Sequence, residues 1–238
     1  MPLPILQHPT FELTIPSTEQ RVKYRPFLVK EEKILLIAQS SEDAADIIRA
    51  IKQIINNCII EGDINVDELP SFDVEYFFLK LRSHSVNNVA KIEITDPDSQ
   101  KEIPLSVNLD EVQVVFDKKH SNKIDLNDDL FITMRYPTYD DLLKTGVETS
   151  DKNIGESLTE LINTCVDKVY DGDDVHSLDD YTPQEATEFI DSLSGQNFQD
   201  IQNFFDTAPR LEHTVNYKVG NKKKKYTLRG IQDFLSWR

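Results

Sequence analysis

Two acidic stretches have the composition of a calcium-binding loop but not its spacing. An EF-hand loop needs oxygen ligands at fixed positions, a glycine at the sixth position and a bidentate glutamate at the twelfth. Counting from Asp167, Gly172 falls at the sixth position, but Val169 occupies the third and Leu178 the twelfth. Because neither apolar side chain can bind the ion, this stretch is not an EF-hand.

The second stretch, which starts at Asp63, fails the same test. Glu68 stands where the glycine is needed, and Val74 stands where the bidentate glutamate is needed. Solvated acidic turns therefore explain both stretches better than calcium sites do. The alternative is a weak, irregular cation site in the first stretch, formed by Asp171, Asp173 and Asp174.

The sequence lacks the spacings that are typical of enzymes and cofactor sites. It contains no HxH or HExxH pair, no GxSxG elbow, no GxGxxG fingerprint and no Walker loop. Residues 95–99 offer no cysteine pair of the kind that holds zinc in a β-hairpin. His213 falls on the apolar side of an expected strand, which favours a hydrogen-bonded core residue over a catalytic base. We therefore predict a protein that is not an enzyme, with no catalytic residue, cofactor, metal or small-molecule substrate.

The two cysteines and the one lysine run have structural explanations. Cys58 and Cys165 each fall on the apolar stripe of an expected helix, which predicts reduced core thiols rather than a disulfide. The basic run, Lys222 to Lys225, lies at the tip of an expected hairpin. A solvated turn, or pairing with the acidic residues 171–180, is the favoured interpretation of this run. Contact with a phosphate or with an acidic partner is the alternative.

The charge of the chain limits its partners. The 42 acidic and 26 basic residues give a formal net charge of -16. Such a charge opposes binding to nucleic acid and to anionic membrane surfaces, and it favours basic protein partners. We expect no membrane span, because no apolar run approaches the required length of about 18 residues. We also expect no secretory signal, since MPLPILQHPTFEL lacks a basic flank followed by an apolar stretch.

The first 88 residues combine a hairpin with helices. Alternation predicts strands over 11–15 and 22–24. Glu31 and Glu32 suit the first turn of a helix that is apolar nearly all round, so we expect it to be buried. Ser40 or Ser41 is expected to cap a second helix, and Ser71 a third. The apolar stripes of these two helices are Ala44, Ile47, Ile48, Ile51, Ile54, Ile55 and Cys58, and Val74, Phe77, Phe78 and Leu81.

The pattern changes twice after residue 88. Short alternating runs over 89–137 predict an all-β insertion. Over 138–238 we expect a helix with a stripe from Ile154 to Val169, a helix capped by Thr182 and ended by Gly195, and a further helix closed by Pro209. A terminal hairpin and a short helix with Phe234, Leu235 and Trp237 follow, and no internal repeat is evident. The predicted class is α+β, with segments 1–88, 89–137 and 138–238 arranged as one or two compact domains.

Two blocks of sequence resemble a known family. They are YRPFLVKEEK, residues 24–33, and LPSFDVEYFFLKLRS, residues 69–83. In order and spacing they are similar to the baseplate hub assembly proteins of T-even-type contractile-tailed bacteriophages. The resemblance is specific over residues 10–85 and becomes diffuse beyond them.

The resemblance implies a non-catalytic role in building the central hub of the tail baseplate. It implies other hub proteins as partners and the host cytoplasm as the place of assembly. Two versions of the role stay open, a chaperone-like assembly protein and a permanent hub subunit of the virion. From the residues alone, an acidic nucleic-acid mimic that captures a basic host protein is a further alternative, as is a metal-dependent hydrolase using carboxylates of 171–180.

Candidate partner contacts fall in the same two blocks. Tyr24 and Arg25 adjoin a pre-proline segment, and the aromatic residues of 72–78 are too many for one narrow helical stripe. Burial of all these rings in the core is the favoured interpretation, and an exposed docking site is the alternative. The candidate contacts are Tyr24, Arg25, Phe27, Lys30, Phe72, Tyr76, Phe77 and Arg82.

Overall fold

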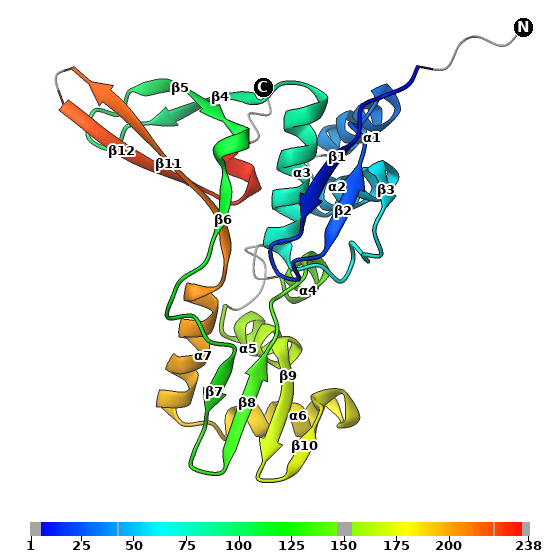
Figure 1. Cartoon of the computed structure of the whole chain (residues 1–238). Helices are drawn as coiled ribbons and strands as arrows, with labels where there is room; N and C mark the ends of the chain where they lie inside the picture. The colour runs from blue at the N-terminus through cyan, green and yellow to red at the C-terminus, as the bar shows by residue number, and fades with distance from the viewer. Residues whose placement is uncertain (1–5, 42, 147–153, 221, 235–238) are drawn as a thin grey trace, which may run out of the picture. The chain divides into compact units, whose positions relative to one another are not determined.

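The chain divides into two compact units, the second of which is inserted in the sequence of the first. A computed structural model describes residues 6–41, 43–146, 154–220 and 222–234, without the side chains of 154–156 (Figure 1). Unit 1 comprises residues 1–115 and 210–238, and unit 2 comprises residues 116–209. This division differs from the segments 1–88, 89–137 and 138–238, since the strands of 89–137 belong to three different sheets. Leu235 and Trp237 lie outside the described residues.

Unit 1 begins with the predicted hairpin, which a third strand extends. Strands β1 (Phe11–Thr14), β2 (Arg21–Tyr24) and β3 (Ile59–Glu61) form an antiparallel sheet in the order β1-β2-β3. The third strand was not expected, because it follows directly on the long helix without a turn signal. The helices of this unit are α1 (Val29–Ser40), α2 (Ala44–Cys58) and α3 (Ser71–Ser85).

The rest of unit 1 is built from hairpins that pack on α3. Strands β4 (Val89–Thr95) and β5 (Glu102–Asn108) pair with each other. A further sheet of unit 1 has the order β12-β11-β6, and it joins the two segments of the unit's sequence, 1–115 and 210–238. Its strands are β6 (Gln113–Val115), β11 (Arg210–Val219) and β12 (Lys222–Arg229), with 3-10 helices at Leu109–Glu111 and Ile231–Phe234.

Helix α3 is central to unit 1 because it carries buried residues on more than one of its sides. Val74, Phe77, Phe78 and Leu81 are all buried, as predicted. On another side of the helix, Leu79 joins the core cluster formed with the β4–β5 hairpin and the β12-β11-β6 sheet. The ammonium group of buried Lys80 donates to three carbonyl oxygens between residues 109 and 112, at 2.7 to 3.1 Å. These bonds satisfy a charge that would otherwise be costly to bury.

Unit 2 is a four-stranded antiparallel sheet with helices (Figure 1). The order is β10-β9-β8-β7, and the core cluster includes Ile132, Ile162, Cys165 and Phe204. The bounds are β7 (Lys123–Asp125), β8 (Leu130–Met134), α4 (Tyr139–Thr145), α5 (Ile154–Cys165), β9 (Val166–Asp171), β10 (Asp174–His176), α6 (Pro183–Asp191) and α7 (Gly195–Thr207), with a 3-10 helix at Leu178–Asp180.

The predicted α+β class is confirmed, but several local predictions are wrong. Helix α1 is not buried, since three of its apolar residues are exposed. Asp43, rather than Ser40 or Ser41, caps α2. Val169 lies on β9 and not on the preceding helix, which ends at Cys165. Gly195 begins α7 instead of ending α6, because the Ser194 side chain caps the helix at that point.

The acidic stretch after Asp167 forms a hairpin. Gly172 adopts a left-handed conformation with φ of 57° in the turn between β9 and β10, where Asp171 pairs with Asp174. The glycine therefore serves the turn, as positive φ requires. Across the described part of the chain, no group of three His, Cys, Asp or Glu residues is arranged to hold a metal ion.

Asp73 fixes the β1–β2 turn against the first turn of α3. The amide and the hydroxyl of Ser17 both donate to its fully buried carboxylate. Burial raises the pKa of Asp73 to about 6, despite these two hydrogen bonds.

We expect Asp73 to make unit 1 less stable as the pH rises from about 4 to 7. The folded state holds a proton that the unfolded state has already released, so the contribution is complete below pH 3.8 and is lost through pH 6. Asp73→Asn should remove this dependence, which is on the order of 2 to 3 kcal/mol. Urea unfolding of both proteins at several pH values measures the difference, and parallel curves would contradict the assignment.

Candidate functional site

The structure separates the predicted partner contacts by exposure. Tyr24, Phe27, Phe72 and Phe77 are buried, so these rings form core, as the favoured interpretation held. Arg25, Tyr76 and Arg82 are half-buried, and Lys30 is exposed. The role of these eight residues as partner contacts stays a prediction. Among them only Lys30, at the start of α1, is exposed.

Arg25 joins three elements at the point where β2 ends. Its backbone amide donates to the carbonyl of Cys58 at 3.0 Å, at the end of α2. Its guanidinium donates to the carbonyls of Pro26 and Asn57, both at 2.9 Å. The same group pairs with Glu31, the third residue of α1, at 3.0 Å. One side chain thus fixes a strand end, a helix start and a helix end, and we call this arrangement the arginine latch.

The electrostatics of the latch favour the charged forms of both partners. Burial opposes the ionisation of Glu31, but hydrogen bonds from Arg25 and the Leu28 amide outweigh it and lower the pKa of this carboxyl. The hydrogen bond to Glu31 raises the pKa of Arg25. The carboxylate of Glu31 is fully buried and also accepts a hydrogen bond from the amide of Leu28, the residue before α1. It is therefore a structural residue, and not only a favourable charge at the helix dipole.

Unit 2 contains a second arginine latch that repeats most of these connections. The amide of Arg135, directly after β8, donates to the carbonyl of Cys165 at 2.8 Å, at the end of α5. Its guanidinium donates to the next residue's carbonyl, in Tyr136, at 3.2 Å and pairs with Asp141 at 2.7 Å. Asp141 is the third residue of α4 and caps that helix together with Thr138.

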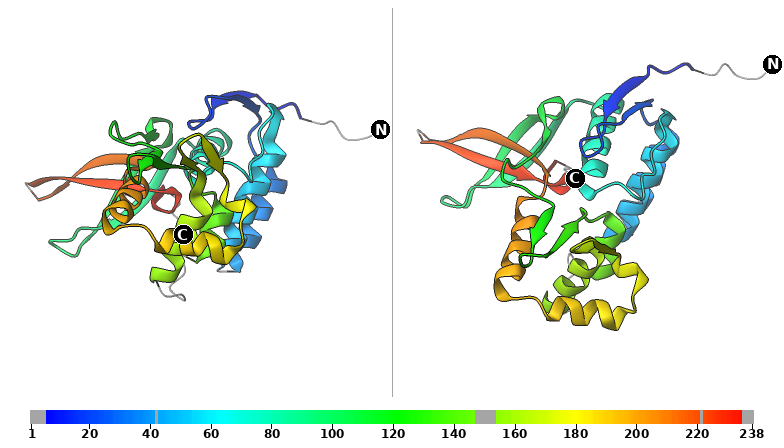
Figure 2. Two further views of the ribbon diagram at one scale, coloured as in Figure 1. Left: turned by 90° about the horizontal axis from the view of Figure 1, so that it is seen from below. Right: turned by 60° about the horizontal axis from the view of Figure 1, so that its bottom comes forward.

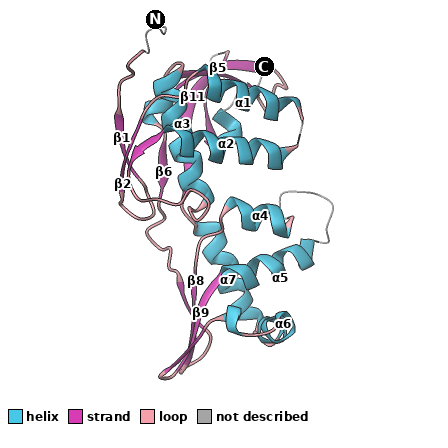
Figure 3. Ribbon diagram, turned by 90° about the vertical axis from the view of Figure 1, so that its right-hand side faces the viewer, coloured by secondary structure: helices cyan, strands magenta, loops and turns pink. Residues whose placement is uncertain are grey.

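The surrounding elements repeat as well. In each unit a hairpin, two helices and a returning strand follow in the same order, and the returning strand pairs antiparallel with the second hairpin strand. Both pairings carry a register shift at the last residues before the arginine. Figure 3 shows α1 beside α2 in unit 1 and α4 beside α5 in unit 2. The chain therefore contains an internal repeat, which the sequence analysis missed.

Each latch covers a buried cysteine. Cys58 and Cys165 are both fully buried and unpaired, as predicted. Burial raises the pKa of the Cys58 thiol to about 11 and that of Cys165 to about 12. Both thiols are thus held protonated and weakly reactive.

Helix α1 presents an apolar surface that nothing in the described part of unit 1 covers. Val29, Leu36 and Ile37 are 66%, 58% and 71% exposed, and their spacing places them along one side of the helix. Lys30 and Lys33 adjoin them and are exposed as well. We call these five residues the α1 stripe. Both views in Figure 2 show α1 lying beside α2, against which its other side packs.

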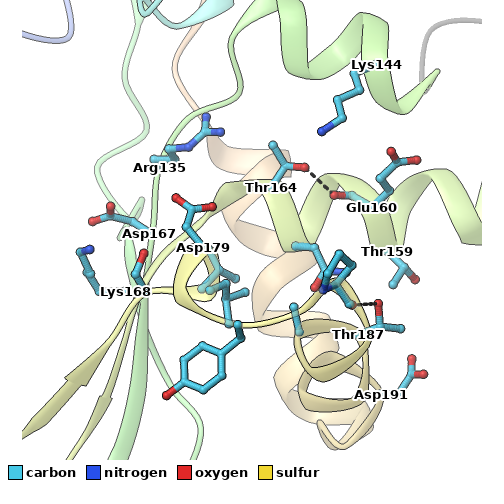
Figure 4. Close-up of a pocket in the computed structure, with 17 residues that line it drawn as sticks. Arg135, Lys144, Thr159, Glu160, Thr164, Asp167, Lys168, Asp179, Thr187 and Asp191 are labelled. Atoms are coloured by element: carbon cyan, nitrogen blue, oxygen red, sulfur yellow. Dashed lines mark hydrogen bonds between the residues drawn. The ribbon is translucent and has the colours of Figure 1, made fainter.

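Unit 2 has a polar groove of about 970 Å³ between α5, β9 and the segment from 177 to 191. Charged groups of both signs line it, including Lys144, Glu160 and Lys168. Figure 4 shows the Asp179 carboxylate directed toward Arg135. The described residues that line the groove include neither histidine nor cysteine.

Comparison with known proteins assigns the chain to a family. A model of the family described as T4 bacteriophage base plate protein matches residues 8–236. The chain belongs to this baseplate family. The match extends well beyond residues 10–85, over both units and both arginine latches. No curated protein and no solved structure matches the chain.

Within the described ranges, no helix has both the length and the apolar character needed to cross a membrane. The features a sequence search could have used for the latches are sparse. They are an arginine after a strand, a carboxylate six residues later and a cysteine at the end of the second helix.

We expect Arg25→Met to destabilise unit 1 by about 2 to 4 kcal/mol, because it leaves the Glu31 carboxylate buried with only Lys30 as a charged partner. Arg49→Met is the matched control, since its ion pair with Asp46 is exposed and should contribute under about 0.5 kcal/mol. Urea unfolding measures the loss, and hydrogen exchange localises it to β2 and α1. Equal effects of the two substitutions would show that Arg25 is not a latch.

Proposed function

We propose that this baseplate-family protein assists assembly of the central hub of the phage tail baseplate, without catalysis, through contacts with other hub proteins. The α1 stripe is the observation that carries the proposal. An exposed patch of large apolar side chains on a soluble domain typically marks a protein interaction site. Family membership supports baseplate proteins as the partners of this surface.

The composition of the α1 stripe indicates the chemistry of its partner. Three large aliphatic side chains favour an apolar surface on the partner. The two lysines beside them favour carboxylates around that surface. Helix α1 is rigidly positioned for such a contact, because the arginine latch holds its first turn and α2 supports its other side.

We expect Leu36→Gln combined with Ile37→Gln to weaken the partner contact at least tenfold, because each apolar side chain contributes about 1.5 to 3 kcal/mol when fully buried. The fold should be unaffected, since both residues are exposed and glutamine suits a helix. Val175→Gln in unit 2 is the control, because it removes an exposed apolar side chain from β10. Co-purification with co-expressed hub proteins of the same phage measures the effect, and undiminished recovery of the double variant would contradict the role of the stripe.

The copy number of the chain in purified particles separates the two versions of the role. Quantitative mass spectrometry, scaled against a known tail component, supplies this number. An assembly protein that leaves the baseplate should be abundant in infected cells and missing from particles. A fixed ratio to the tail component would instead establish a permanent subunit of the baseplate.

A further inference from the structure

The β11–β12 hairpin of unit 1 carries a basic cluster on one face. The register places Lys218 directly opposite Lys223 and Asn216 opposite Lys225. Because alternate residues of a strand point to the same face, these residues share one side of the hairpin. All three lysines are exposed. We call Lys218, Lys223 and Lys225 the lysine face.

Two basic residues beside the lysine face, Lys224 and Arg229, are neutralised, whereas the face itself is not. Lys224 points to the opposite side and pairs with Asp96 at 2.5 Å and Asp98 at 2.7 Å, in the β4–β5 turn. At the base of the hairpin, Arg229 pairs with Glu212. Among the described residues, no carboxylate pairs with any member of the lysine face. The structure thus leaves the three ammonium groups of the face together, and Lys222 at the tip beside them is exposed as well.

Such a cluster is not a by-product of composition. The chain has 16 more acidic than basic residues, so carboxylates are abundant. Like charges directly opposite each other on paired strands oppose the pairing, and Lys218 and Lys223 stand in this relation. Lysines on an edge strand can also protect it from unwanted pairing, and β12 is an edge strand. At Lys218 strand β11 is also open on its other side, because β6 pairs only with residues 210–212 of β11, so the two strands of the tip have two free edges.

We propose that the lysine face binds an acidic, extended protein segment of another baseplate component, an inference that rests on the proposed function. Charge complementarity selects the acidic character of this segment. The free edge of β12 favours an extended conformation, because its outward amides and carbonyls can pair with an added strand. A protein segment fits better than nucleic acid, since the net charge of -16 repels a long polyanion but tolerates a short acidic stretch.

Site-specific cross-linking in infected cells tests the proposal on the full chain. A photoreactive residue replaces Asn216, which lies on the lysine face without contributing to its charge. Mass spectrometry of the cross-linked peptides should identify a segment of another baseplate protein that is rich in Asp and Glu. Cross-links to nucleic acid, or to peptides without an acidic surplus, would overturn the proposal.

Charge-neutralising variants supply the matched control. Replacing Lys218, Lys223 and Lys225 by Gln should reduce the cross-linked yield at least tenfold. The melting temperature should not fall, because the substitution relieves the repulsion across the hairpin. The same change at three exposed lysines elsewhere should leave the yield intact, and these are Lys101, Lys118 and Lys119. An unchanged yield in the first variant would overturn the proposal.

A comparison with the α1 stripe separates this inference from the proposed function. If Leu36→Gln with Ile37→Gln abolishes co-purification with hub proteins while the lysine-face variant has no effect, the proposed function stands and the lysine-face inference is wrong. If the chain with all its apolar and lysine residues in place does not co-purify with any baseplate protein, and its photoreactive form at position 216 cross-links to none, both are wrong.

Discussion

The architecture depends on one interaction, the contact of an arginine with the ends of three elements at once. In each unit the arginine follows a strand, and its amide, guanidinium and neighbours fix the start of one helix and the end of the next. Helix ends leave backbone carbonyls without partners, and a guanidinium with five donors is well suited to satisfy several of them. The planar, permanently charged group also holds a buried carboxylate that lysine would hold less specifically.

The two latches are not equally buried, and the helices that they support expose different surfaces. The Arg25 side chain is 17% exposed and its carboxylate partner is fully buried, whereas the Arg135 side chain is 40% exposed. In unit 1 the latch supports a twelve-residue helix whose outer side is apolar. In unit 2 it supports a seven-residue helix, and Arg135 instead borders the polar groove. The same support thus presents an apolar surface in one unit and a polar one in the other.

Sequence patterns predicted the elements of this fold better than their connections. Apolar residues at helical spacing located α2, α3 and α5, although α3 is buried on more than one side, and the capping signal at Thr182 located α6. The same reasoning placed α1 in the core, since periodicity cannot tell an apolar helix that is covered from one that is open. Strand β3 was not predicted, because it follows α2 without an intervening turn.

The candidate site was harder to predict for a physical reason. Arg25 was singled out, but its partners lie 6 and 33 residues away in the sequence, and no local pattern joins Glu31 to Cys58. The internal repeat was not predicted for a related reason. The latch geometry requires particular residue types at only a few positions in each unit, so the other positions of the two sequences can differ. Three of the four lysines of the run are exposed, as the solvated interpretation held. Lys224 instead pairs with Asp96 and Asp98 of the β4–β5 turn, and not with residues 171–180.

The insertion of unit 2 has a consequence for how the protein is made. The chain leaves unit 1 at Val115 and returns to it at Arg210, and these two residues are paired between β6 and β11. On a ribosome, β6 therefore waits for its neighbour until the whole of residues 116–209 has been translated. During that interval the apolar residues of α3 and of the β4–β5 hairpin that pack under the sheet lack their cover. A chain that ends before Arg210 would lack β11 and β12, so the core of unit 1 beneath this sheet would stay uncovered.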